Sequence, residues 1–480
     1  MKKIITIIAC ILSSALLFYF SDGIKGQYSV LQWLAPVPIL LLSFYLKIGQ
    51  VFIVSFIASF LGRLGWLSYL CTLMPQVPAV IVVTLLSLAF TLAVLFSRHA
   101  LLKIKAWYAV FAFPVIFTTY EWLLISFSYD GSAASIAYSQ CQLPALIQIA
   151  SLTGILGITF IVAFIASFLS MAVYFRQNIA ELLPLVITGC LIIVLVFTFG
   201  VLRLGKDHEG DMIPVALVVL DEDQHKFEPA DNSFEIRNAE NYASVINDMA
   251  KKGAKLVVFP ERAINVNKET ESTIKSILCT TAKDNGITIV AGYTNYIADQ
   301  AKNSTWVIDE TGKIICDYNK AHPVKGLESQ FAKGNEIAIF PLNGFQGGVA
   351  ICKDLDYPGY IRQYGRKGVT FLCIPAWDFS VDGWLHSRMA ILRGVENGFS
   401  EVRAARTGRL TISDAYARIT AEANSEEGKA TELYGFINSN RIETPYSKSD
   451  KEWLGIACAI AFVLFIMKVI LKKRSIRIGD

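Results

Sequence analysis

Cys352, within GGVAICKDLDYPGY, has the sequence setting of a nucleophile. The apolar residues 349–351 predict a strand that stops at the thiol, and the polar Lys353 and Asp354 predict a turn directly after it. Backbone N–H groups at such a turn can stabilise the oxyanion that forms when a thiolate attacks a carbonyl carbon. Cys373, in VTFLCIPAW, is followed by further apolar residues and is typical of an ordinary buried thiol. The polar turn therefore favours Cys352 as the candidate nucleophile.

Two further reactive residues follow apolar, strand-like runs: Glu261 follows LVVFP, and Lys320 follows IICDYN. A carboxylate can accept the thiol proton, and an ammonium group can stabilise the oxyanion while an acyl group moves onto sulfur. Alone, either residue is typical of a solvated turn. The order Glu, Lys, Cys, with each residue closing an apolar strand, is a more specific pattern and predicts acyl chemistry.

The elements that must position these residues alternate between strand-like and helix-like patterns. Alternating strands and helices, with hairpins, predict an α/β or α+β sandwich of two sheets with helices outside. Strands are expected at 214–220, 254–261 and 287–295, twice within 303–320, at GGVAIC and at VTFLCIPAW; helices are expected at 233–251, 273–284 and YPGYIRQYGRKG.

The composition divides the 480 residues into three regions. With 54% hydrophobic and 18% charged residues, the chain is too apolar for one soluble domain. We expect a membrane domain of about seven helices at 1–203, a catalytic domain at 204–450, and a transmembrane helix with a basic tail at 451–480. The apolar blocks of bilayer length are 4–20, 29–46, 50–71, 77–96, 106–127, 149–175, 183–203 and 453–471.

The basic residues of the short loops predict the orientation of these spans. Lysine and arginine residues at 2–3, 47, 98–105, 176 and 472–477 all fall on one side if the spans alternate. The first block has no small-residue cleavage site, so we expect a retained span rather than a signal peptide. An even number of spans then places both termini in the cytoplasm and the catalytic domain outside the inner membrane.

The sequence gives no support for several other functions. The net charge is +4, and the basic residues do not form the cluster that nucleic-acid binding would need. The nine cysteines and five histidines show no C-x-x-C pair and no metal-ligand spacing, so we expect no metal and no other cofactor.

Glu121, in FTTYEWLLIS, is costly in hydrocarbon and is therefore either functional or snorkelling to the interface.

The soluble region resembles the nitrilase (carbon–nitrogen hydrolase) superfamily, whose Glu–Lys–Cys triad matches VVFPERA, YNKAHPVKGLE and VAICKDLDYP. YEWLL and residues 137–169, 376–408 and 443–453 resemble the apolipoprotein N-acyltransferases, so the resemblance covers nearly the whole chain. It implies a multi-span α-helical membrane domain plus an extracytoplasmic αββα nitrilase-like sandwich at the bacterial inner membrane. It also implies transfer of a phospholipid acyl chain to the amine of a diacylglyceryl-cysteine at a lipoprotein's N-terminus.

The resemblance further implies a role for each matching residue. Glu261 would be the general base and Cys352 the nucleophile that carries a thioester. Lys320 and the backbone N–H of Lys353 would hold the oxyanion, and Glu328 would orient the site. Supporting and possible lipid-contacting positions also include Asp354, Phe227, Glu121 and Trp377.

Three positions and one segment depart from the family pattern. Phe227 stands roughly where a tryptophan is usual, Lys353 replaces an aromatic residue, and Asp354 replaces a glutamate. The segment HPVKGLE is short, as in soluble nitrilases. The alternative function is a membrane-tethered amidase, in which water resolves the thioester. A non-catalytic protein that has kept the fold is a third reading, which the intact triad disfavours.

Overall fold

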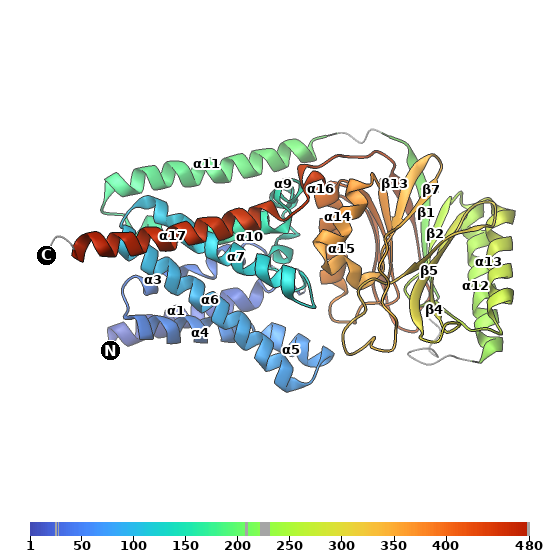
Figure 1. The fold of residues 1–480 in the computed structure, drawn as a ribbon, viewed down its shortest axis with the longest axis horizontal. Coiled ribbons are helices and arrows are strands. Elements are labelled where there is room, and N and C mark those ends of the chain that lie inside the picture. The colour runs from blue at the N-terminus through green and yellow to red at the C-terminus, as the bar shows by residue number, and fades with distance from the viewer. Residues whose placement is uncertain (25, 27, 207–209, 221–230, 478–480) are drawn as a thin grey trace. The chain divides into compact units, whose positions relative to one another are not determined.

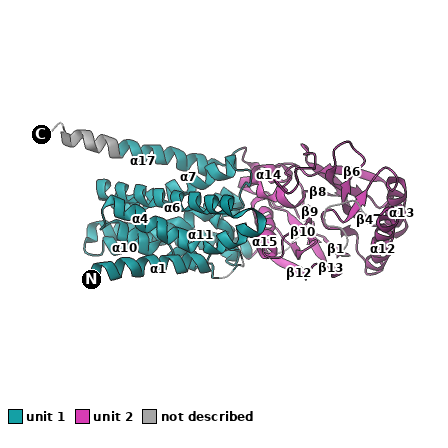
Figure 2. Cartoon of the chain, turned by 90° about the horizontal axis from the view of Figure 1, so that it is seen from below, with its two compact units in different colours: residues 1–204, 451–480 teal, residues 205–450 magenta. Residues whose placement is uncertain are grey.

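The computed structural model describes residues 1–24, 26, 28–206, 210–220 and 231–477, with side chains described as far as residue 468. The chain forms two compact units, one of residues 1–204 with 451–480 and one of residues 205–450 (Figure 2). Phe227, expected as a possible lipid contact, lies outside the described residues.

The unit of residues 205–450 contains two β-sheets that pack face to face (Figure 1). In spatial order the first sheet consists of β13 (Thr431–Asn438), β1 (Met212–Val219), β2 (Leu256–Val258), β4 (Thr288–Asn295), β5 (Lys302–Ile308) and β6 (Ile314–Asn319), with β3 (Ile264–Val266) paired to β4. The second sheet consists of β12 (Ile419–Ser425), β11 (Gly408–Ser413), β10 (Ser400–Ala405), β9 (Phe371–Ala376), β8 (Phe345–Val349) and β7 (Ala338–Leu342).

Strand β1 shows why the strands read as continuous apolar runs. Val215 and Leu217 point into the core between the sheets, whereas Ala216 and Val218 point to the opposite face, where helices cover the sheet. Helices α12 (Asn232–Lys251) and α13 (Glu271–Asn285) cover the first sheet, and α14 (Pro358–Arg366) and α15 (Gly383–Asn397) cover the second. The expected sandwich of two sheets with helices outside is confirmed.

Parallel pairing brings several strand ends to one edge of the second sheet. Strands β8 and β9 are parallel with Val349 opposite Cys373, and β9 and β10 are parallel with Ala376 opposite Ala405. The residues that follow these strands therefore lie together. Glycines in β8 permit this close packing, because a Cβ on Gly347 would lie 2.5 Å from the Phe371 ring.

Two expected strands are shorter than the sequence pattern indicates. The strand expected at 254–261 is β2, which ends at Val258, because Pro260 has no N–H for a ladder. The strand expected to end on the thiol stops at Val349, and a 3-10 helix, η3 (Cys352–Asp356), carries Cys352. Both reactive residues consequently stand on turns beyond the strands.

The other unit is helical, with helices drawn from both ends of the chain (Figure 1). Five of its described helices are long and apolar enough to cross a membrane, or six if one bent pair is a single span. Its elements are α1 (Lys2–Phe20), α2 (Leu31–Leu34), α3 (Val37–Ser43), α4 (Ile48–Gly62), α5 (Leu64–Leu73), α6 (Gln76–Ile104), η1 (Trp107–Phe111), α7 (Ala112–Phe127), η2 (Ile136–Gln140), α8 (Pro144–Ile147), α9 (Ala150–Thr153), α10 (Ile155–Tyr174), α11 (Ile179–Leu204) and α17 (Trp453–Arg477).

Several of the expected apolar blocks are not single helices, and block 149–175, for example, is divided into α9 and α10 at Gly154. Block 29–46 forms α2 and α3 instead of one span, because Pro36 and Pro38 favour a new helix start over a continuous helix. Block 50–71 is broken at Arg63, where α4 and α5 meet at a bend of 54°. Helix breaks therefore interrupt hydropathy blocks that look continuous in the sequence.

Candidate active site

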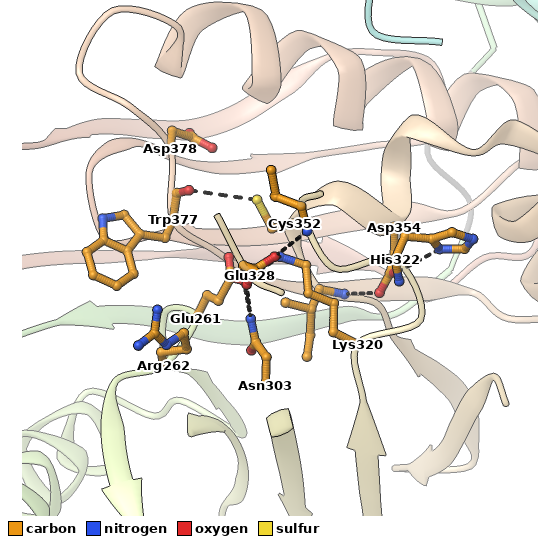
Figure 3. A network of polar contacts seen from close by, with 12 residues as sticks. Glu261, Arg262, Asn303, Lys320, His322, Glu328, Cys352, Asp354, Trp377 and Asp378 are labelled. Carbon is orange, nitrogen blue, oxygen red and sulfur yellow. Dashed lines mark hydrogen bonds and ion pairs between the residues drawn. The ribbon is translucent and has the colours of Figure 1, made fainter. Parts of the chain in front are cut away.

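Lys320 is the centre of a buried ionic cluster (Figure 3). Its Nζ lies 2.7 Å from Oε1 of Glu261 and 2.8 Å from Oε2 of Glu328. Glu261 follows β2, and Lys320 directly follows β6. The structure thus brings together the predicted base, the predicted ammonium group and the second glutamate.

Asn303, at the start of β5, was not singled out from the sequence. Its Nδ2 donates to Oε1 of Glu261 at 2.5 Å and to Oε1 of Glu328 at 2.8 Å, and its carbonyl accepts from the Lys320 N–H at 2.9 Å. One amide therefore holds both carboxylates in place. No local pattern marks this asparagine, because its partners are 42 and 25 residues away.

Cys352 begins η3 with a positive φ of 43°, a left-handed conformation that is uncommon for a side chain other than glycine. Its Sγ lies 3.8 Å from the carbonyl oxygen of Trp377, which follows the parallel neighbour strand β9 (Figure 3). The thiol is half-buried, whereas Cys373 is fully buried in the core between the sheets. The two cysteines that the sequence contrasted therefore have different surroundings.

Electrostatics around the thiol disfavour a free thiolate. Burial raises the pKa of Cys352 well above its ordinary value, and the negative charge of Glu261 raises it further, against an opposing effect of Lys320. Burial also raises the pKa of Glu261, and Lys320 counteracts that rise. A thiol and a nearby carboxyl group whose pKa is raised are suited to proton transfer during attack, because the base gains affinity for the proton.

The remaining members of the cluster stay charged. Burial alone would lower the pKa of Lys320, but the two glutamates raise it well above the ordinary lysine value. Burial alone would raise the pKa of Glu328, but Lys320 lowers it overall. The cluster therefore contains a permanent ammonium group that a developing oxyanion could share.

Asp354 and Lys353 shape the turn that holds the thiol. The Asp354 carboxylate is fully buried and accepts from the Ile351 N–H at 2.9 Å and from the Tyr318 hydroxyl at 2.6 Å. The Lys353 side chain points to Asp356, with Nζ 3.0 Å from Oδ2. The sequence predicted a role only for the backbone N–H of Lys353. The Lys353 ammonium group forms an ion pair with Asp356.

Each of the two units matches a different known family. The carbon–nitrogen hydrolase family matches residues 234–446, and the N-terminal domain of apolipoprotein N-acyltransferase matches residues 14–168. An apolipoprotein N-acyltransferase of Geobacter metallireducens is 25% identical over 443 residues, which is 82% of this chain and 82% of that protein. The chain belongs to the apolipoprotein N-acyltransferase family. The family and the enzyme class predicted from the motifs are confirmed.

Other similar proteins include a second acyltransferase and two amidases. An apolipoprotein N-acyltransferase of Aquifex aeolicus is 24% identical over 321 residues, covering 60% of this chain and 68% of that protein. A 2-oxoglutaramate amidase of Bacillus subtilis is 29% identical over 198 residues, covering 38% and 74%. A solved amidase of Nesterenkonia sp. covers 52% of this chain and 97% of that chain, with 18% identity and a TM-score of 0.44.

Around the thiol of this acyltransferase, arginine residues hold Trp377. The guanidinium of Arg406 lies 4.4 Å from the ring centroid and that of Arg262 lies 5.4 Å from it. Arg262 directly follows Glu261 and has a positive φ of 54°. Trp377 was expected as a possible lipid contact, and the structure places its carbonyl against the Cys352 sulfur. Arg262 and Arg406 were not predicted, because only the fold stacks them on this ring.

Glu121, another possible lipid contact, lies in the helical unit of the acyltransferase and is buried in α7. Its carboxylate accepts from Ser135 Oγ and the Ile136 N–H, both at 2.9 Å, and from Thr159 Oγ1 at 2.5 Å. The Glu121 side chain is therefore satisfied by partners within the helical unit. Among the described residues, no group of three or more His, Cys, Asp or Glu side chains is placed to hold a metal ion.

Proposed function

We propose that this acyltransferase moves an acyl chain from a phospholipid to the N-terminal amine of a diacylglyceryl-cysteine lipoprotein, through a thioester on Cys352. The observation that carries the proposal is the convergence of a base, an ammonium group and a thiol. Glu261 and Lys320 are within 2.7 Å of each other, and both act on the pKa of Cys352. Relatives that cover most of the chain are named for the same acceptor class.

The first step forms the thioester. Glu261 accepts the Cys352 proton while sulfur attacks the ester carbonyl carbon of the phospholipid. The resulting oxyanion is stabilised by the Lys320 ammonium group and the backbone N–H of Lys353. The carbon–oxygen bond then breaks, and the leaving oxygen takes the proton from Glu261, which releases a lysophospholipid.

The second step resolves the thioester with an amine. Glu261 removes a proton as the lipoprotein amine attacks the thioester carbonyl carbon, and the same donors stabilise the second oxyanion. The carbon–sulfur bond breaks, and the sulfur of Cys352 regains a proton. Hydrogen bonds that involve Glu328 and Asn303 hold the Glu261 and Lys320 side chains in position during both steps.

We place the protein in the bacterial inner membrane as a multi-pass protein with both termini in the cytoplasm. The membrane domain would be residues 1–203, the catalytic domain residues 204–450 outside the cytoplasm, and the last transmembrane helix residues 451–480. The basic residues of the short loops support this orientation. Labelling of single cysteines introduced into the loops of intact cells tests it, since reagents that cannot cross the membrane should reach only the catalytic side.

An amidase that uses water is the second candidate. The similarity to a 2-oxoglutaramate amidase over the catalytic unit favours it, and so does the short segment after Lys320. The same thioester would form from an amide, and water would replace the amine in the second step. The first step would then release ammonia or an amine in place of the lysophospholipid, although attack by Cys352 would be the same in both candidates.

The deciding experiment incubates the purified full-length protein with a phospholipid labelled in one acyl chain. Acyl transfer predicts label on Cys352 that hydroxylamine removes, followed by passage of the label to a diacylglyceryl peptide with a free amine. The peptide with an acetylated amine is the matched control and should accept nothing. Release of labelled fatty acid with an unmodified peptide, or release of ammonia from an amide in the same protein, would favour the amidase.

A further inference from the structure

The helical unit contains a polar pocket, and none of the residues that line it belongs to the candidate active site. It is lined by the end of α1, the junction of α4 and α5, the middle of α6, the middle of α7 and the segment 134–139. Its polar groups include Arg63, Asp22, Gln32, Tyr120 and Glu121, set among apolar side chains of the same helices. Charged groups among apolar membrane helices are costly and usually functional.

Arg63 offers hydrogen-bond donors to this pocket. It stands at the break between α4 and α5, where the two helices are bent by 54°. Its Nη1 donates to the Oγ and the carbonyl oxygen of Ser59, and the guanidinium lies 5.6 Å from the Phe18 ring centroid. A guanidinium has five N–H donors. No carboxylate in the part of the chain that the structure describes forms an ion pair with Arg63.

The two carboxylates that line the pocket already have partners within the protein. Glu121 accepts three hydrogen bonds, from Ser135, the Ile136 N–H and Thr159. Asp22 accepts from the Ile24 N–H at 3.0 Å and lies against the first turn of α5, where a Cβ on Gly65 would be 2.4 Å from its Oδ2. The positive end of that helix favours the Asp22 charge.

The groups left for a ligand are therefore mostly donors. Arg63 retains Nε and Nη2, and the Gln32 side chain uses its Oε1 to accept from Ser21 at 2.7 Å. The Tyr120 hydroxyl adds a third donor from α7. A guanidinium flanked by an amide and a hydroxyl matches an anion with several oxygens, because it can donate two parallel N–H···O bonds.

We propose that this pocket binds the phosphate group of a phospholipid. The apolar residues around the donors and the membrane setting of the helices favour a lipid over free phosphate, which offers the same anionic oxygens. Leu61 and Leu64, beside Arg63, are 36% and 41% exposed on the helix surface and could contact acyl chains there. The proposal does not rest on the thiol chemistry, because no residue is shared between this pocket and the site around Cys352.

The test uses the full-length protein with Cys352→Ala, so that bound lipid is not consumed. After delipidation, native mass spectrometry measures retention of added phosphatidylglycerol, of diacylglycerol, which lacks phosphate, and of inorganic phosphate. We expect one tightly held phosphatidylglycerol, at least tenfold weaker retention of diacylglycerol, and a tenfold or greater loss in Arg63→Gln. Arg63→Lys should keep part of the affinity, and Tyr120→Phe, which removes only a hydroxyl, should lower it several-fold.

Arg98→Gln is the matched control within the same helical unit. Arg98 donates to the Ser43 and Leu46 carbonyls at 2.8 and 2.9 Å, so the protein already uses its donors. Lipid retention should be unchanged in this variant. Binding of inorganic phosphate alone, lost in Arg63→Gln, would support the anion site and assign it to the free ion. Retention of phosphatidylglycerol that is equal in the parent, Arg63→Gln and Tyr120→Phe proteins would overturn the proposal.

Discussion

The Asp354 carboxylate holds His322 at two points: the backbone N–H of His322 donates to Oδ1 at 2.8 Å, and the ring Nδ1 lies 2.9 Å from the same oxygen. The His322 ring also stacks on Tyr357, with centroids 3.8 Å apart. Because Asp354 accepts from the Ile351 N–H as well, it ties the segment that follows Lys320 to the turn that carries Cys352. Relative placement of the ammonium group and the thiol therefore depends on this buried carboxylate.

We predict that Asp354→Asn lowers the rate of acylation of Cys352 by about 10²-fold, because a displacement of about 1 Å in a reacting group has an effect of that size. The amide keeps the shape but replaces one acceptor oxygen with a donor. Single-turnover labelling with a radioactive phospholipid measures the rate. Asp309→Asn, in the exposed turn between β5 and β6, is the matched control and should react like the parent. Equal rates in all three proteins would contradict the positioning role.

Cys352 and Cys373 form a natural pair for a second prediction. Cys352→Ala should abolish thioester formation and all turnover, because no other thiol stands in the site. Cys373→Ala should keep turnover and lower the free energy of unfolding by about 1 kcal/mol, the cost of a small cavity in the core. Thermal unfolding and labelling of both variants check this. A loss of turnover in Cys373→Ala as complete as in Cys352→Ala would be evidence against the assignment.

A third prediction concerns the pH dependence of acylation. The reaction needs Glu261 ionised, and burial raises the pKa of Glu261 above its ordinary value of 4.5. The acylation rate should therefore fall as the pH is lowered through that raised pKa. Glu261→Gln should reduce the rate at neutral pH by at least about 10²-fold and remove the acid limb of the profile. An acid limb that persists unchanged in Glu261→Gln would assign it to another group.

We also predict how the parent protein and Glu261→Gln differ in alkylation of the Cys352 thiol. Since the pKa of Cys352 is raised well above 9.0, iodoacetamide should react slowly at neutral pH and faster as the pH rises. Glu261→Gln removes a negative charge near the sulfur and should lower that pKa. Rapid alkylation of the parent at pH 7 would contradict this description of the resting thiol.

Asn303 provides a fourth test of the cluster. Asn303→Asp places a third carboxylate against Glu261 and Glu328, with only Lys320 to compensate, so the protein should lose acylation activity and unfold at a lower temperature. Asn295→Asp, at the end of β4, keeps the same change of charge outside the cluster and should have a small effect. If both variants behave alike, the loss reflects charge in general and not this cluster.

The last prediction uses His386 in α15, whose Nε2 lies 3.3 Å from Oδ2 of Asp382. Burial alone would lower the pKa of His386, but Asp382 raises it overall from 6.5 to about 9. Because the folded pKa is higher than the unfolded one, this pair stabilises the fold fully below pH 6.5, and its contribution disappears as the pH rises through about 9. Thermal melting of the full-length protein from pH 6 to 10 should show this decline, and Asp382→Asn should reduce it, because Asp378 and Asp356 raise the same pKa to a smaller extent.

The sequence was sufficient to select the candidate reactive residues that the structure places close enough to interact. Glu261, Lys320 and Cys352 each follow an apolar run, and the distinction between Cys352 and Cys373 was visible in the polarity of the following residues. Helices such as α12 and strands such as β1 lie where their periodicity placed them. These features are local, because burial of a strand or a helix face imposes a regular pattern on neighbouring residues.

Other features depend on contacts between distant segments, and only the tertiary structure determined them. Asn303 bonds to carboxylates that lie far from it in the sequence, and Arg406 stacks on Trp377 because parallel strands bring their ends to one edge. Arg63 lies at a helix break inside an apolar block whose hydropathy is continuous. Side-chain hydrogen bonds and stacking between strand ends leave no periodic trace in a sequence, since they depend on register and not on spacing.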